Sequence, residues 1–415
     1  MINKNNVGKI VGVLFFCMIF IFYSVEAELN NSFNKQPVAT LSGDVFYVGG
    51  SGSGNYTKIQ DAVDNASDGD TVFVFDKASP YHENILIGKS IFLIGEDKNM
   101  VVIDADFKGM AVTITADNVV VSGFTMIHPP AEHFNNWESE LVNIVSVENV
   151  TIKDNIMQQN QIYLGGNRGG VILRNSSYCF IQNNTISKGD DTRPSAGVAV
   201  ILGSTFNNVS GNEIYNYTGG VYIESCSDNI FYMNYLHNNM NGLQINLGYN
   251  NTIISNIINF NTDEGIRLDG GFNSVIFGNI ITDNGEGGDL DRGIGIIGGS
   301  DNFISYNHIS NNDPSGIDII SINNIITNNE ISHNNIGVYC DTGYNNHITK
   351  NNFIFNKKNG YFEVGILYSK NYWDKNYWNR PRSIPYPIFG KLVGFFNMFR
   401  WVNFDWHPAL KPYDI

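Results

Sequence analysis

Cysteine and positive charge are both scarce in this sequence. The 415 residues include four cysteines, of which Cys179, Cys226 and Cys340 lie beyond the N-terminal segment. Three cysteines leave at least one thiol unpaired, so no disulfide framework supports the fold. Lys and Arg number 25 against 40 Asp and Glu, a formal net charge of −15. This balance argues against binding to nucleic acid and to anionic membrane surfaces.

Apolar residues form a short run near the N-terminus, at residues 11–23, preceded by Lys4 and Lys9. Val25-Glu26-Ala27 follows as a cleavage motif. These features predict that residues 1–27 are a secretory signal peptide and that the protein is exported. The alternative is an uncleaved N-terminal anchor, although 13 residues are few for crossing a bilayer. Export would permit glycosylation at nine Asn-x-Ser/Thr sequons, which an Asn-rich chain also produces by chance.

Asparagine recurs at regular intervals through the middle of the chain. Nine Asn residues each begin an Asn-x-apolar-x-x-polar segment, at intervals of 29, 28, 22, 22, 23, 28, 22 and 22 residues. A base period of 22 with local insertions is typical of a solenoid, in which each repeat stacks on its neighbours. The nine anchors are Asn155, Asn184, Asn212, Asn234, Asn256, Asn279, Asn307, Asn329 and Asn351.

A glycine followed by alternating apolar residues marks a second position in each repeat. The residues one and three places after each glycine are all apolar, and those between them mostly are not. This period of two predicts a strand with one buried face. Cys340 occupies one of these inward positions, which indicates a small core residue. The eight glycines are Gly170, Gly197, Gly220, Gly242, Gly265, Gly293, Gly316 and Gly337.

Each repeat therefore accommodates three strands of about four residues, joined at bends where Asn and Gly tolerate left-handed backbone angles. Inward-facing Asn side chains at the same bend of successive coils would hydrogen-bond to one another as a ladder. The Leu-x-x-Leu-x-Leu pattern of leucine-rich repeats is absent, and no coil carries the longer apolar stripe of a helical repeat. The sequence predicts an all-β fold, a right-handed parallel β-helix with repeats over residues 127–370.

Both ends of the chain depart from the repeat. After a linker at 28–43, residues 44–126 are expected to form an N-terminal cap and the first coils, with a capping box at 57–60 opening a short helix. Residues 371–415 are expected to form a C-terminal cap. Within it, the apolar stretch 388–402 is expected to fold back over the last coil. The alternative is an interfacial membrane helix or a docking segment for an envelope protein.

Several motifs resemble those of a known superfamily. The closing segment, Asn371-Tyr-Trp-Asp with Pro385-Tyr-Pro-Ile, and residues 44–378 as a whole are similar to NosD-like and parallel β-helix repeat surface proteins of the pectin-lyase-like superfamily. The resemblance implies the fold and leaves activity open, because this fold hosts lyases, hydrolases, epimerases and proteins without known catalysis. The motifs that resemble its opening segment are Tyr56-Thr-Lys-Ile-Gln, Asp68-Gly-Asp-Thr-Val, Tyr81-His-Glu-Asn-Ile and Lys89-Ser-Ile-x-Leu-Ile-Gly.

Outward-facing strand positions, two and four residues after each glycine, are candidates for a binding surface. Anchor-to-glycine intervals of 15, 13 and 14 residues place three insertions at the bend beside this face. A polar floor between such loops predicts a groove that binds an extended glycan. The candidate substrate-binding residues are Arg193, Tyr222, Gln244, Asn246, Arg267, Asp318 and Tyr339.

Four carboxylates are candidates for acid/base catalysis, namely Asp190, Asp191, Glu224 and Asp269. Paired carboxylates carry out glycosidic chemistry. Strand spacing predicts roughly 10 Å between Glu224 and Asp269, which lie two coils apart. Arg193 or Arg267 would neutralise a uronate in a lyase or an epimerase. The known activity motifs of the superfamily are not met: the Arg-x-Pro-x-x-Arg of pectate lyases is absent, for example.

The NosD resemblance implies copper-site maturation as a further alternative. The eight histidines occupy different offsets in their coils, so no ligand pair is identified. No cofactor or metal is expected, apart from Ca²⁺ between the carboxylates of 283–291 as an alternative. The sequence thus favours a cell-surface protein, extracellular or periplasmic, that binds a polysaccharide or envelope glycan or serves as a structural envelope component. A polysaccharide lyase, hydrolase or C5-epimerase is the alternative.

Overall fold

The computed structural model describes residues 43–105, 109–128, 140–159, 168–189, 195–286, 288, 291–365, 370–393 and 398–415. All of them fall within one compact unit, Leu41–Ile415. The signal peptide expected at 1–27 lies outside the described residues. Among those residues, no helix has the length and apolar character that crossing a bilayer requires.

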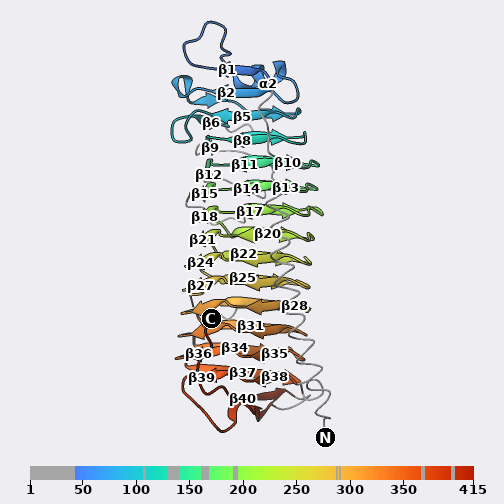
Figure 1. The fold of residues 1–415 in the computed structure, drawn as a ribbon, viewed down its shortest axis with the longest axis vertical. Helices are drawn as coiled ribbons and strands as arrows, with labels where there is room; N and C mark the ends of the chain where they lie inside the picture. Colours follow the sequence, from blue (N-terminus) through green and yellow to red (C-terminus); the bar gives the residue numbers. More distant parts are fainter. Residues whose placement is uncertain are drawn as a thin grey trace. The chain divides into compact units, whose positions relative to one another are not determined.

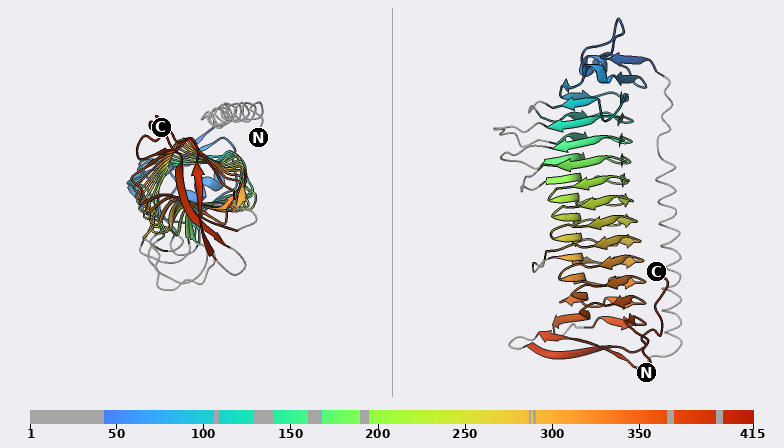
Figure 2. Two further views of the ribbon diagram at one scale, coloured as in Figure 1. Left: turned by 90° about the horizontal axis from the view of Figure 1, so that it is seen from below. Right: turned by 90° about the vertical axis from the view of Figure 1, so that its left-hand side faces the viewer.

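The chain winds into a stack of coils, and each full coil adds one short strand to each of three sheets, A, B and C (Figure 1). Strands of successive coils pair in parallel and in register, as Val221, Leu243 and Ile266 do in sheet C. Seen along the axis, the three sheets enclose a common interior (Figure 2), which one cluster of buried hydrophobic side chains fills. The predicted right-handed parallel β-helix is confirmed.

The strands of each sheet follow one another along the stack. Sheet A contains β1 (Val45–Val48), β2 (Thr71–Val74), β5 (Phe92–Gly95), β8 (Val120–Ser122), β11 (Thr151–Lys153), β14 (Phe180–Gln182), β17 (Asn208–Ser210), β20 (Ile230–Tyr232), β23 (Thr252–Ile254), β26 (Val275–Phe277), β29 (Phe303–Ser305), β32 (Ile325–Thr327), β35 (His347–Thr349) and β38 (Tyr372–Asp374). Sheet B contains β3 (Tyr81–His82), β6 (Val102–Asp104), β9 (Thr125–His128), β12 (Ile156–Gln159), β15 (Thr185–Lys188), β18 (Glu213–Tyr215), β21 (Tyr235–His237), β24 (Ile257–Asn259), β27 (Ile280–Thr282), β30 (His308–Ser310), β33 (Glu330–Ser332), β36 (Asn352–Ile354) and β39 (Tyr377–Trp378). Sheet C contains β4 (Ile85–Ile87), β7 (Val112–Ile114), β10 (Val142–Val145), β13 (Arg168–Arg174), β16 (Ser195–Ile201), β19 (Gly219–Glu224), β22 (Asn241–Asn246), β25 (Glu264–Asp269), β28 (Arg292–Ser300), β31 (Ser315–Ile322), β34 (Ile336–Asp341), β37 (Lys358–Gly365), β40 (Tyr386–Val393) and β41 (Met398–Asp405).

The apolar residues predicted to face inward do form the core. All sixteen residues at one and three places after the glycines of sheet C are fully buried. Cys340 is among them, as predicted, and the described cysteines are buried and free. Alternation of buried and outward side chains along each strand fixes the register, because a slip by one residue would expose the whole inward set.

Stacked asparagines join the coils at the bends. The backbone N–H and the side-chain Nδ2 of Asn234 donate to Oδ1 of Asn256 in the next coil, over 2.9 and 3.0 Å. Nδ2 also donates to the carbonyl of Val209 in the preceding coil. The predicted ladder is therefore confirmed, and it supplies partners for buried backbone groups that would otherwise be unpaired.

Two further ladders at the other two bends were not predicted. Their described members include Asn207, Asn229 and Asn251 between sheets C and A, and Asn239, Asn261 and Asn284 between sheets B and C. At the bend between sheets A and B, the left-handed residue is the one before the anchor, such as Met233 (φ 53°), rather than the anchor Asn. The ladders therefore hold backbone conformations that most side chains avoid.

The N-terminal end is covered by the short helix α2 (Ile59–Asn65), followed later by a 3₁₀ turn, η1 (Asp76–Ala78). Ile59, Ala62 and Val63 face the core, as predicted. The predicted capping box is wrong, because the N-cap makes no side-chain hydrogen bond. Instead, the Glu83 carboxylate accepts hydrogen bonds from the first two N–H groups of α2, over 2.8 and 2.9 Å. A distant acid thus caps the helix and complements its dipole.

The C-terminal end is closed by a β-hairpin. β38 and β39 still continue sheets A and B beyond residue 370, and β40 then pairs in parallel with β37 while β41 returns antiparallel to β40. The described residues of the stretch 388–402 therefore form strands rather than an interfacial helix: those in β40 continue sheet C, and those in β41 return beside it. The fully buried Asp405 accepts from the backbone N–H of Asn376, taking the place of the next ladder Asn.

Candidate functional site

The predicted binding positions lie on the outer face of sheet C. Strand pairing aligns them in two parallel stacks. One stack runs through Ala199, Tyr222, Gln244 and Arg267. The other runs through Glu224, Asn246 and Asp269. Glu224 and Asp269 are therefore two strands apart, a separation of roughly 10 Å, with Asn246 between them.

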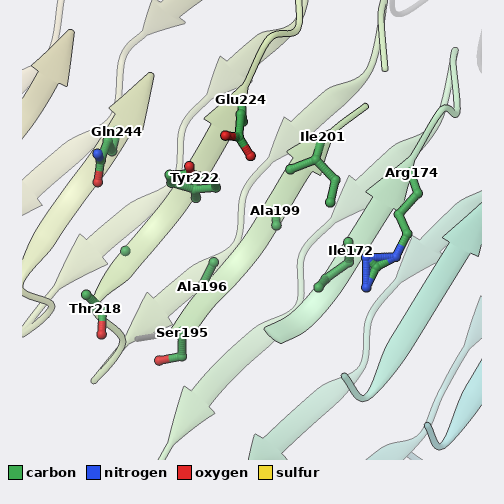
Figure 3. A pocket seen from close by; sticks show the side chains of 11 residues that line it. Ile172, Arg174, Ser195, Ala196, Ala199, Ile201, Thr218, Tyr222, Glu224 and Gln244 are labelled. Atoms are coloured by element: carbon green, nitrogen blue, oxygen red, sulfur yellow. The ribbon is translucent and has the colours of Figure 1, made fainter. Parts of the chain in front are cut away.

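A groove with a volume of about 280 Å³ crosses this face over β13, β16, β19 and β22 (Figure 3). Its floor is apolar and shallow, because Ala199 and Gly219 present little or no side chain. Arg174 stands at one side, and Tyr222 and Gln244 stand at the other (Figure 3). The lining residues are Ile172, Arg174, Ser195, Ala196, Ala199, Ile201, Thr218, Gly219, Tyr222, Glu224 and Gln244.

The two charged residues of the groove differ in their surroundings. Nη2 of Arg174 donates to Oε1 of Glu140, whose side chain is buried, so the cation is balanced within the protein. Glu224 is exposed at the groove beside Tyr222, and no cation among the described residues pairs with it. Of the charges that the structure describes at the groove, the negative charge of Glu224 is therefore the one left for a ligand.

Tyr222 is oriented by a short chain of amides. Nε2 of Gln244 donates to Oδ1 of Asn246 over 3.0 Å, and Nδ2 of Asn246 donates to the Tyr222 hydroxyl over 3.1 Å. Burial and the nearby charge of Glu224 raise the pKa of Tyr222, so its hydroxyl stays protonated and able to donate. The arrangement presents hydroxyl, amide and carboxylate groups above an apolar floor.

A buried ionic cluster lies next to the groove, on β25, β28 and β31. Glu264 is fully buried and contacts Arg267 at 3.2 Å and Arg292 at 3.3 Å. Arg292, only 2% exposed, also contacts Asp318 at 3.3 Å. Arg267 makes a second contact with Asp269, at 3.2 Å. The guanidinium groups of Arg267 and Arg292 therefore each form ion pairs with two carboxylates.

Burial dominates the protonation behaviour of this cluster. It raises the pKa of Glu264 to about 7 and that of Asp318 to about 6, against the opposing effect of the arginines. Gly295 leaves room for the Glu264 carboxylate, since a Cβ there would lie 2.4 Å from Oε1. The insertion before β28 is anchored close by, where Asp291 accepts from the backbone N–H of Glu286 and Gly288.

The sequence-predicted site residues separate into four groups. Tyr222, Glu224 and Gln244 line the groove, and Asn246 supports them. Arg267, Asp269 and Asp318 belong to the ionic cluster. Tyr339 lies further along, with its ring 5.5 Å from that of Tyr361. Asp190, Asp191 and Arg193 lie outside the described residues, just before Ser195.

Sequence reasoning missed Glu264 and Arg292, which occupy the position directly before the repeat glycine. Simple alternation does not direct that position outward, because it lies three residues before the next outward position, yet the side chain of Glu264 contacts the outward Arg267. Glu140 and the small floor residues were missed as well. A comparison of side-chain sizes along the outward stack would have revealed the floor.

Comparisons with known proteins agree with the fold. Residues 91–242 and 140–291 match the model of the right handed beta helix region, and residues 236–391 match that of the periplasmic copper-binding protein NosD. No curated protein sequence matches the chain. The chain belongs to the right-handed parallel β-helix superfamily.

Solved structures with the same fold differ widely in what they do. The surface adhesin PfbA of Streptococcus pneumoniae has a TM-score of 0.58 and 13% identity, with 74% of this chain and 89% of that chain covered. The GH136 lacto-N-biosidase from Eubacterium ramulus has a TM-score of 0.52 and 10% identity, with 80% and 68% covered. DFA-IIIase from Arthrobacter chlorophenolicus A6 has a TM-score of 0.51 and 11% identity, with 75% and 84% covered.

Copper, which the NosD match implies, does not fit the described residues. Within them, no three His, Cys, Asp or Glu side chains lie close enough together to hold a metal ion. Histidines of the matched region instead contact other groups, such as Glu213 for His237 and Glu330 for His308. His347 stacks on Tyr372. These contacts explain the histidines as separate surface groups.

Proposed function

We propose that this protein is an exported β-helix protein that binds a glycan in the groove over β13–β22. The observation that carries the proposal is the composition of the groove: an apolar floor with hydroxyl, amide and carboxylate groups around it. Sugars combine apolar C–H faces with hydroxyl groups, and such ligands suit concave sites with a few convergent polar groups. The groove lies on the strand face, so a chain of sugars would extend along the stack of coils.

The charge of the groove favours a neutral or amine-bearing glycan over a polyuronate. Arg174 is balanced by Glu140, and Arg267 is balanced by Glu264 and Asp269. Glu224 adds a negative charge that would repel a uronate and attract an ammonium group. This differs from the role first considered for Arg267, in which it would neutralise a uronate.

Export is part of the same proposal. The N-terminal segment has the pattern of a signal peptide. The matching family model describes a periplasmic protein, and PfbA is a surface adhesin. These points support a place in the periplasm or on the cell surface, where glycans are abundant.

A glycan array that contains neutral, amino-sugar and uronate polymers tests the proposal, with products followed by mass spectrometry. We expect binding to neutral or amino-sugar glycans, and weaker binding with Tyr222→Ala or Glu224→Gln. Ala199→Phe should block the groove without a change of charge. Tyr235→Ala, on the outer face of sheet B, is the matched control and should bind normally. Binding to nothing, or binding that the groove variants leave intact, would refute the proposal.

Product analysis decides whether the bound glycan is also cleaved. Glu224 is the single carboxylate among the described lining residues, and glycosidic cleavage generally uses two. We therefore expect binding without products. Products that disappear in Glu224→Gln would convert the proposal from a binding protein to an enzyme.

A further inference from the structure

Charge is distributed unevenly along the chain. Residues 376–415 contain five Lys and Arg against two Asp, a net charge of +3. The rest of the chain contains 20 Lys and Arg against 38 Asp and Glu, a net charge of −18. One of the two C-terminal acids, Asp405, is fully buried. The surface at this end is therefore basic, although the whole chain carries −15.

The same end exposes large aromatic side chains. Phe389 is 65% exposed, Phe399 53%, Trp401 58% and Trp406 63%. Phe389 pairs across the hairpin with Val402, and Lys391 pairs with Arg400, so these four lie on one face. Phe399 and Trp401 alternate with Arg400 and Val402 along β41, so their side chains lie on the opposite face of the hairpin. We call the hairpin β40–β41 with its neighbour Trp406 the aromatic tip.

Exposed aromatic residues next to Lys and Arg match the chemistry of a membrane–water interface. Tryptophan and other aromatic rings concentrate at the level of the lipid headgroups. Lys and Arg near an anionic leaflet add to binding, and aromatic anchors with basic residues are typical of peripheral membrane contact. The hairpin lies across the end of the stack, away from α2 (Figure 2).

We propose that the aromatic tip docks the protein onto an anionic lipid surface. A second copy of the chain fits less well, because the exposed rings lie on both faces of the hairpin and one flat protein surface would cover a single face. A fluid lipid interface covers both. The acidic body does not prevent docking, since charges are screened beyond about 8–10 Å and successive coils lie about 4.8 Å apart. Only the last coils are within range of the surface charge.

Vesicle sedimentation of the full chain tests the proposal. We expect binding to phosphatidylcholine vesicles that contain phosphatidylglycerol, weaker binding at high salt, and little binding to phosphatidylcholine alone. Each Lys or Arg near the surface contributes about fivefold in partitioning. Arg380→Gln/Arg400→Gln, which neutralises two exposed side chains, should therefore lower binding about 25-fold. Lys58→Gln/Lys77→Gln, equally exposed at the opposite end, should leave it unchanged.

The aromatic contribution is tested with a second pair of variants. Trp401→Ala should weaken vesicle binding several-fold, whereas Tyr249→Ala, which removes a similarly exposed ring in the middle of the stack, should not. Both proteins retain residues 11–23, so a difference between them cannot come from that apolar segment. Tyr222→Ala should also bind vesicles normally, which separates this proposal from the glycan groove.

Three results would overturn the proposal. The first is the absence of binding to anionic vesicles. The second is equal loss of binding in the C-terminal variants and their controls. The third is concentration-dependent association of the chain with itself that Trp401→Ala abolishes, measured by sedimentation velocity, because this would assign the aromatic tip to a second copy.

Discussion

Removal of the buried guanidinium of Arg292 should destabilise the middle coils. Arg292 is 2% exposed and lies between Glu264 and Asp318, at 3.3 Å from each carboxylate. Arg292→Met keeps the apolar stem and deletes the charge, so it leaves both acids buried without that cation. Loss of one partner from a buried ion pair costs about 3–5 kcal/mol. We expect a loss of that size in the free energy of unfolding at pH 8.

The cost should depend on pH, and its sign follows from the two acids. The pKa of Glu264 is about 7 and that of Asp318 about 6 with the arginine present. Without Arg292, both pKa values rise further, because the cation no longer opposes burial. The acids then take up protons as the pH falls, which removes the unpaired charge. The destabilisation should therefore be largest at pH 8 and smaller at pH 5.

Urea unfolding at the two pH values measures this effect. Lys391→Met is the control, because it breaks a partly exposed ion pair with Glu363 and should change stability little at either pH. Glu264→Gln combined with Arg292→Met should recover part of the loss. A cost that is the same at pH 5 and pH 8, or no cost at pH 8, would refute the reasoning.

Three further predictions concern the same scaffold. The wild-type chain should lose stability as the pH rises from about 4.5 to 7, because the folded state retains a proton on Glu264 that the unfolded state releases. The shift from 4.5 to about 7 corresponds to roughly 3 kcal/mol, and Glu264→Gln should flatten this part of the pH profile of urea unfolding. Asn256→Ala should cost about 2–4 kcal/mol in thermal or urea unfolding, since it leaves several buried ladder groups unpaired, whereas Asn259→Ala on the outer side of β24 should be tolerated. Gly295→Ala should lower the free energy of unfolding by about 1–3 kcal/mol, because its Cβ would meet Glu264. Gly219→Ala should leave stability unchanged, because its Cβ would lie 3.7 Å from its nearest neighbour. Equal stability of the two glycine variants would contradict the packing described.

The fold was predictable because its rules are local and repeated. The alternation of apolar residues after each glycine determines which side chains enter the core, and Asn155 to Asn351 mark one bend in every coil. The helix cap was not predictable in the same way. Thr57 and Gln60 have the spacing of a capping box. The N–H groups at the start of the helix donate instead to Glu83, 24 residues beyond Ile59, because the next coil lies directly against the helix.

The candidate site was predictable only in part. The alternation of side chains along a strand correctly predicts that Tyr222, Glu224 and Gln244 point outward, because it depends on the local sequence alone. The groove itself depends on small residues in adjacent coils, and the pairing of Arg292 with acids from both neighbouring coils depends on the register between them. Such contacts join residues more than 20 positions apart, so no local motif reports them.

The asparagine ladder ends in a different residue from those that build it. An internal Asn such as Asn234 donates to both neighbouring coils and accepts from the preceding one, whereas the Asp405 carboxylate can only accept, which suits the last position because no further coil follows. Each internal Asn is therefore equivalent to the next, and Asp405 can end the ladder whatever the number of coils before it. An added 22-residue coil would lengthen the stack by about 4.8 Å and leave both caps unchanged. The length of this protein is thus a quantity that gene duplication or design can vary one coil at a time.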